Sequence, residues 1–94
     1  MRKIYIMANI RDLKKDINFV LGDIIDAVYI WEAINPKEDH SKSEAIIDDA
    51  IATFDDLIAK VNDNKVENRS KHLKAVNAEL EERGKALIDR VNAL

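Results

Sequence analysis

The chain lacks cysteine, and among its 94 residues it has only two glycines and one proline. Without cysteine, disulfide bonds and thiolate metal sites are excluded. So little glycine and proline excludes a fold rich in β-turns, and it also excludes glycine-rich phosphate loops and the tight turn that presents a nucleophilic serine. The lack of cysteine fits a reducing compartment, and we predict a cytoplasmic protein.

Charge is plentiful but unevenly distributed. Hydrophobic residues make up 47% of the chain and charged residues 35%, a mixture typical of helical bundles. Residues 36–63 contain three basic and eight acidic side chains, whereas residues 64–94 contain seven basic and five acidic ones. We interpret these segments as antiparallel helices with complementary flanks. Acidic residues interrupt the basic ones of the last segment, so we predict no nucleic-acid partner; a basic face would consist of Lys65, Arg69, Lys71 and Lys74.

Neither a signal peptide nor a membrane span is predicted. Arg2 and Lys3 precede an apolar run of only Ile4–Met7, too short for a signal peptide. Residues 17–34 include 13 apolar residues of 18, but Asp23 and Asp26 near their middle are costly in a bilayer. The segment Met7-Ala8-Asn9 resembles a second start. We therefore predict a natural start at Met7, with residues 1–6 either disordered or an extension ahead of it, and one helical-bundle domain at residues 7–94.

Apolar residues alternate three and four positions apart, which predicts long helices at about 9–34, 41–63 and 65–92. The connections between them are short, so consecutive helices are expected to be antiparallel neighbours. Proline 36 ends the first helix, because the residue before a proline avoids the helical conformation. The predicted fold is all-α, an antiparallel up-down-up three-helix bundle.

Helix starts are indicated by cap-type residues. Asn9 is a candidate N-cap of the first helix. Ser41 and Glu44 have the spacing of a capping box at the start of the second helix. Asn64 and Glu67 have the same spacing and predict the start of the third.

Each predicted helix has one apolar face directed at the core. The first face contains Ile10, Leu13, Ile17, Val20, Ile24, Ala27 and Trp31, widened by Leu21, Ile25 and Val28. The second contains Ile47, Ile51, Phe54, Ile58 and Val61, widened by Ile46, Ala50 and Leu57. The third contains Val66, Leu73, Val76, Leu80, Leu87, Val91 and Leu94. Gly84 interrupts the third face and is predicted to admit a bulky neighbour, Trp31 or Phe54; a break in the helix is the alternative.

Residues suited to catalysis or metal binding do not converge in the sequence. The second helix has two acidic stripes, for which we predict solvated or salt-bridging roles: Glu44, Asp48 and Asp55, and Asp49, Asp56 and Asp63. The Glu-x-x-His motif of di-iron bundles is absent. The two histidines, His40 and His72, have no evident partners. We therefore predict no catalytic, metal or cofactor site, and no enzymatic activity.

The first helix has more apolar residues than its core face needs, and this excess is the one feature of the sequence that indicates a function. After the core face is assigned, an outer face is left: Phe19, Gly22, Tyr29, Ile30 and Ala33, with Asp23 and Asp26 among them. An exposed apolar patch on a small protein usually marks an interface. We predict an interface with a second copy, first of all in a homodimer, or with another protein. Coverage by residues 1–6 and a plain apolar surface are the alternatives.

The stretch Met7–Ile25, MANIRDLKKDINFVLGDII, followed by AVYIWE, resembles a family of small bacterial all-helical proteins of unknown function. The resemblance implies a helical bundle in a bacterial cytoplasm and implies no activity or site residues. The sequence thus favours a non-enzymatic interaction module. The alternative is a ligand-binding or enzymatic bundle with a pocket near Trp31, Tyr29 and Gly84.

Overall fold

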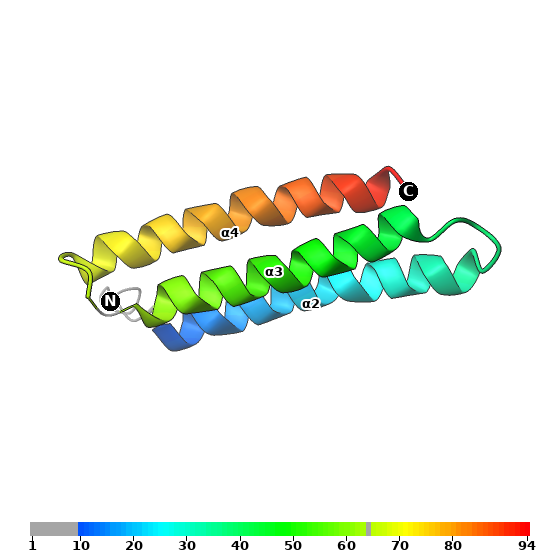
Figure 1. The fold of residues 1–94 in the computed structure, drawn as a ribbon. Coiled ribbons are helices and arrows are strands. Elements are labelled where there is room, and N and C mark those ends of the chain that lie inside the picture. Colours follow the sequence, from blue (N-terminus) through cyan, green and yellow to red (C-terminus); the bar gives the residue numbers. More distant parts are fainter. Residues whose placement is uncertain (1–9, 64) are drawn as a thin grey trace, which may run out of the picture.

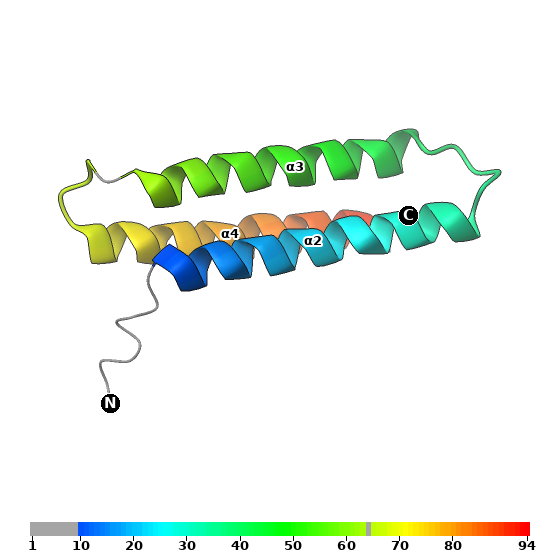
Figure 2. The ribbon, with the colours of Figure 1, turned by 90° about the horizontal axis from the view of Figure 1, so that it is seen from below.

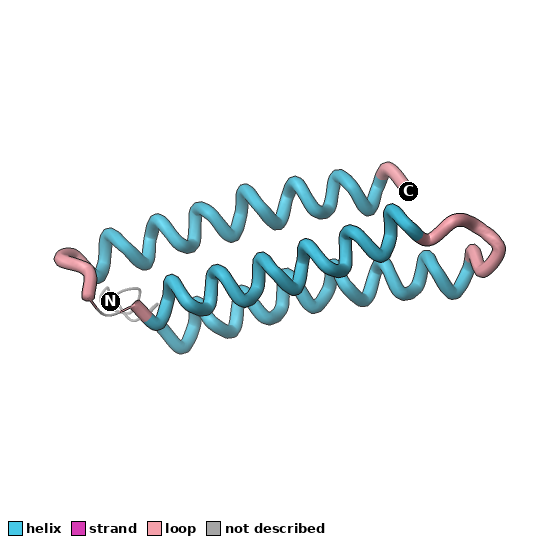
Figure 3. Tube along the Cα trace, in the orientation of Figure 1, coloured by secondary structure: helices cyan, strands magenta, loops and turns pink. Residues whose placement is uncertain are grey.

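The computed structural model describes residues 10–63 and 65–94, which form three helices and no strand (Figure 1, Figure 3). The helices are α2 (Ile10–Ile34), α3 (Ser41–Asn62) and α4 (Arg69–Asn92). Each packs against the other two, and the chain reverses direction at both connections (Figure 2). The predicted all-α, up-down-up three-helix bundle is therefore confirmed. The predictions for Asn9, Met7 and residues 1–6 lie outside the described residues.

The connection between α2 and α3 ends α2 and begins α3 at the predicted residues, but the cap of α3 differs from the prediction. The backbone N–H and the side-chain Nδ2 of Asn35 each lie 2.9 Å from the carbonyl oxygen of Trp31, which closes α2 before Pro36. The predicted capping box of α3 is wrong. Ser41 donates its hydroxyl to Asp39 at 2.9 Å, and the cap position is taken by His40, whose side chain makes no cap bond.

The start of α4 is later than predicted. Asn68 is the N-cap, and its Oδ1 accepts a hydrogen bond from the Lys71 N–H at 3.0 Å. The predicted start near residue 65 is wrong: the Lys65 N–H is held by Asp63 Oδ1 at 3.0 Å, in a turn outside the helix. Val66 accordingly lies in the connection and not on the α4 face.

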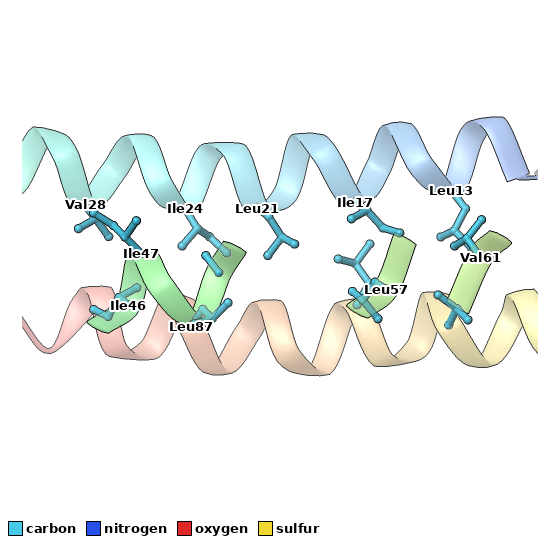
Figure 4. Close-up of a cluster of buried hydrophobic side chains, with 13 residues drawn as sticks. Leu13, Ile17, Leu21, Ile24, Val28, Ile46, Ile47, Leu57, Val61 and Leu87 are labelled. Carbon is cyan, nitrogen blue, oxygen red and sulfur yellow. The ribbon is translucent and has the colours of Figure 1, made fainter. Parts of the chain in front are cut away.

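Thirteen buried apolar side chains from all three helices form one continuous core (Figure 4). Leu13, Ile17, Leu21, Ile24 and Val28 project from one side of α2 toward α3 and α4. The buried residues of the other helices are Ile46, Ile47, Ala50, Leu57, Val61, Val76, Leu80 and Leu87. Burying this apolar surface is the main stabilising contribution to the bundle.

Two residues assigned to the core by their spacing are exposed instead. Ala27 is exposed, whereas Leu21 and Val28, predicted at the edge of the α2 face, are buried at its centre. In α3 the buried line passes through Ala50 and Thr53, and Ile51 is 48% exposed. The predictions for Ala27 and Ile51 are wrong because each helix is rotated slightly about its axis relative to the expected face.

Gly84 lies buried in an unbroken α4 and faces α2. A Cβ atom at this position would lie 3.2 Å from Val20 Cγ1. The neighbour that the glycine admits is therefore Val20, and the prediction of Trp31 or Phe54 is wrong. The alternative of a break in the helix is excluded by the continuous helix from Arg69 to Asn92.

Candidate functional site

The outer face of α2, defined as Phe19, Gly22, Tyr29, Ile30 and Ala33, lies on the side of the helix away from the core. Phe19 is 56% exposed, Tyr29 53% and Ile30 60%, so three large apolar side chains of one helix reach solvent. Ala33 is exposed as well. The exposure that the sequence indicated for this face is thus observed, while its use as an interface stays a prediction.

Gly22 leaves a small depression in the outer face of α2, because it has no side chain. Apart from the backbone of α2 itself and the two adjacent residues, no atom of the described chain lies within 4 Å of the position that a Cβ atom would occupy there. Among the described residues nothing therefore crowds this position, in contrast to Gly84. A backbone or ring from outside could approach α2 most closely at Gly22.

The outer face is bordered by acidic and further apolar groups. Asp23 and Asp26 are exposed between Phe19 and Tyr29. Ile34, the last residue of α2, is 71% exposed and extends the apolar surface to the end of the helix. The sequence did not assign Ile34 to this face, because it lies on the flank of the helix and not on its outward line. The surface as a whole is apolar with negative charge at its middle.

A polar cluster at the turn between α2 and α3 has the shortest side-chain contact across these helices. The hydroxyl of Ser43, which is fully buried, lies 2.5 Å from Glu32 Oε2 and 2.9 Å from the carbonyl oxygen of His40. A hydrogen bond with Glu32 and the charge of Glu32 raise the pKa of the Glu44 carboxyl. The cluster thus joins two carboxyl groups and a hydroxyl, and the hydroxyl belongs to a serine that is fully buried.

Both histidines fasten a connection to a backbone carbonyl. His40 Nε2 lies 2.9 Å from the Asn35 oxygen, and its ring meets the edge of Trp31 at 5.7 Å between centroids. His72 Nε2 lies 2.6 Å from the Lys60 oxygen in the last turn of α3. A carbonyl can only accept, so each Nε2 must donate its proton. The histidines therefore have structural partners that the sequence did not reveal.

The acidic stripes of α3 form ion pairs with α4. Asp56 Oδ2 lies 2.6 Å from Arg83 Nη1, and Glu79 lies 2.9 Å from Lys60 Nζ. Asp49 pairs with Arg90 at 2.6 Å. Hydrogen bonds from Lys60 and then Arg83 lower the pKa of Glu79. The salt-bridging role predicted for Asp49 and Asp56 is confirmed. Within the described ranges 10–63 and 65–94, no three His, Asp or Glu side chains are grouped as a metal site.

A shallow groove lies where the first turns of α2 and α4 meet. It has a volume of about 650 Å³ and is lined by Ile10, Arg11, Lys14, Arg69 and Leu73. Its basic side chains could attract an anion, and the described residues that line it include no carboxyl, imidazole or hydroxyl group. Arg69 is the one residue that it shares with the basic face considered in the sequence.

Trp31 and Gly84, two of the three residues of the alternative pocket, are not brought together. Gly84 faces Val20, which precedes Trp31 by eleven residues in α2. At about 1.5 Å per helical residue, the two levels of the bundle are roughly 16 Å apart. Trp31 packs against His40 at the end of the bundle instead. The geometry therefore gives no support to a pocket shared by Trp31 and Gly84.

No protein-family model, curated protein or solved structure matches the chain. Of the resemblance carried by Met7–Ile25 and AVYIWE, the small all-helical fold is what the structure shows. Bacterial origin and membership of that family stay predictions. Among the described residues, no helix has both the length and the apolar character needed to cross a membrane.

Proposed function

We propose that this chain is a non-enzymatic interaction module that associates with itself through the outer face of α2. The single observation behind the proposal is that Phe19, Tyr29 and Ile30 are each more than half exposed on one helix. Solvent-exposed apolar groups gathered in this way on a small bundle usually become buried in an interface. A symmetric homodimer is the first expectation, since two-fold association is the commonest closed assembly.

Two further observations support an interaction role over a catalytic one. The buried hydroxyl of Ser43 and both histidine rings have structural hydrogen-bond partners. Among the described residues, the groove at the first turns of α2 and α4 is lined by basic and apolar side chains and by no carboxyl or imidazole group. A cytoplasmic location and a bacterial origin belong to the same proposal and rest on composition and resemblance alone.

Sedimentation equilibrium of the purified protein tests the proposal. We expect a dimer at high micromolar concentration and a monomer for the double variant Tyr29→Glu/Ile30→Lys, because charges on this face cannot be buried without partners. The matched control is Ile51→Glu/Ile88→Lys, which changes two exposed apolar side chains, 48% and 45% exposed, on α3 and α4. This control should dimerise as the unmodified protein does.

Two results would contradict the proposal. One is a strict monomer at high micromolar concentration that neither double variant changes. The other is a chain beginning at Met7 that dimerises while the full chain does not, because residues 1–6 would then cover the outer face of α2.

A further inference from the structure

A regular line of residues follows the outward side of α2, opposite the side chains that enter the core (Figure 4). Its members alternate three and four positions apart, the spacing by which one helix packs along another in a coiled coil. None of them is buried in the described chain. They are Asp12, Lys15, Phe19, Gly22, Asp26, Tyr29 and Ala33, and we call them the outer seam.

We infer that the outer seam packs on the outer seam of a second copy, with the two α2 helices antiparallel and Phe19 of each copy seated on the partner's Gly22. The inference rests on the proposed function and adds an orientation and a register to it. The spacings of three and four divide the seam residues into two kinds of position, a and d. In an antiparallel coiled coil each a residue faces a d residue of the partner. Phe19 and Gly22 are successive seam positions, so two-fold symmetry forms the same contact twice.

The space at Gly22 suits an aromatic ring from outside. Nothing in the described chain lies within 4 Å of its Cβ position, so the partner's ring would meet only the α2 backbone. Phe19, at 56% exposure, stands out from the helix one turn away. A large side chain opposite a missing one gives the close packing that a helix pair needs.

The same register pairs the charges of the outer seam. It places Lys15 opposite the partner's Asp26, again twice by symmetry, so each cation faces an anion. It also places Asp12 opposite the partner's Tyr29, whose phenol hydroxyl can donate to a carboxylate. Charged, aromatic and small positions of the outer seam are therefore complementary within one arrangement.

In a parallel pair the facing residues of the two outer seams are not complementary. Each seam residue then faces its own counterpart, so Lys15 meets Lys15 and Asp26 meets Asp26, and two bulky Phe19 rings compete for one layer. Like charges in contact disfavour that arrangement. Asp16 and Asp23 border the outer seam on one edge. In the antiparallel pair Asp16 lies near Asp23 of the second copy, and this repulsion keeps the antiparallel dimer weak.

Charge reversal tests the register. Lys15→Asp and Asp26→Lys each place like charges opposite one another in their own homodimers, and we expect each homodimer to weaken by about tenfold or more. Mixing the two variants makes both facing pairs opposite in charge, so native mass spectrometry with one variant isotope-labelled should show mainly heterodimer. The matched control is a mixture of Lys85→Asp with Asp48→Lys, exposed positions on α4 and α3, which should show no preference.

A glycine variant tests the ring contact separately. Gly22→Leu should leave the monomer folded, because the position opens to solvent, yet fill the space that the partner's Phe19 occupies and weaken the dimer by about tenfold or more. The register would be wrong if the wild-type protein dimerises, the single variants dimerise equally well and the mixture shows no preference for the heterodimer. Self-association itself would then still be supported. A wild-type protein that stays monomeric at high micromolar concentration would overturn both proposals.

Discussion

Ser43 is a buried serine whose hydroxyl connects α3 to the carboxylate of Glu32 on α2. The same hydroxyl lies 2.9 Å from the carbonyl oxygen of His40, one turn earlier. A carboxylate at a partly buried contact needs a donor, because leaving it without one costs the desolvation of the charge. The serine therefore joins the first turn of α3 to α2 through a buried hydrogen bond.

Replacing Ser43 with alanine should lower the free energy of unfolding by about 1–2 kcal/mol, because Glu32 then loses its donor. Urea unfolding monitored by circular dichroism measures the change. The control is Ser70→Ala, an exposed serine in the first turn of α4, which should change the free energy by less than about 0.5 kcal/mol. Equal effects at the two positions would contradict the role of Ser43.

The sequence could not identify Ser43, because it lies in the polar run Ser41-Lys42-Ser43-Glu44, which fits a helix cap equally well. Its burial depends on the rotation of α3 about its axis, and its partner is eleven residues away on another helix. The same reason applies to His40 and His72, since their acceptors are backbone oxygens that local spacing cannot place.

Among the helices, the two glycines provide a matched comparison. Both lie inside a helix, where glycine is less favourable than alanine by roughly 0.8–1 kcal/mol. Gly22 has open space at its Cβ position, whereas Gly84 has Val20 Cγ1 at 3.2 Å. The close packing of α2 against α4 thus favours glycine at position 84, whereas no described residue crowds position 22.

Gly22→Ala should raise the free energy of unfolding by about 0.5–1 kcal/mol, measured by urea denaturation at low protein concentration, where association does not contribute. Gly84→Ala should give a smaller gain or a loss, because Val20 must move to accept the added methyl group. An equal gain at both positions would show that Val20 shifts freely and that α2 and α4 are not tightly packed at this level.

The sequence predicted the existence and order of the helices better than their rotation. In α3 two neighbouring rows of residues have the four-three spacing of a buried face. Hydrophobicity alone favours the row that contains Ile51. The structure buries the line through Ala50 and Thr53, where smaller side chains face both other helices. Periodicity defines a stripe, but its centre depends on where the neighbouring helices lie, which is a property of the whole bundle.

Across the whole molecule, α3 and α4 are joined by a network in which Lys60 and Arg83 both contact Glu79, at 2.9 Å and 2.8 Å. These bonds lower the pKa of Glu79 in the folded state. A lowered carboxyl pKa contributes stability that is fully present above the unfolded value, about 4.3, and is lost as the pH falls through the folded value. Glu44 acts in the opposite sense, because its pKa is raised.

Glu79→Gln should therefore lower the free energy of unfolding at pH 7 by about 0.5–1 kcal/mol and make its decrease in acid less steep. Thermal unfolding at neutral pH and between about pH 3 and 5 measures both effects. The control Glu81→Gln changes an exposed carboxyl group of the same helix and should resemble the unmodified protein at each pH. If the free energy of unfolding of Glu79→Gln fell in acid as steeply as that of the unmodified protein, the role of the network would be contradicted.

The sequence predicted which apolar residues of the candidate site are exposed. The exposure of Phe19, Tyr29 and Ile30 follows from subtracting the core face of one helix, and the structure agrees. The use of this face as an interface does not follow in the same way, because none of the described residues of the chain covers these three side chains.

An odd number of helices leaves one helix dipole uncompensated. α2 and α4 point in one direction and α3 in the other (Figure 1). Partial positive charge at a helix start and negative charge at its end therefore sum to a net dipole, positive near Ile10 and Arg69 and negative near Ile34 and Asn92. A second molecule lying antiparallel along α2 would set the opposite ends of the two dipoles side by side, so that the pair as a whole would have almost none.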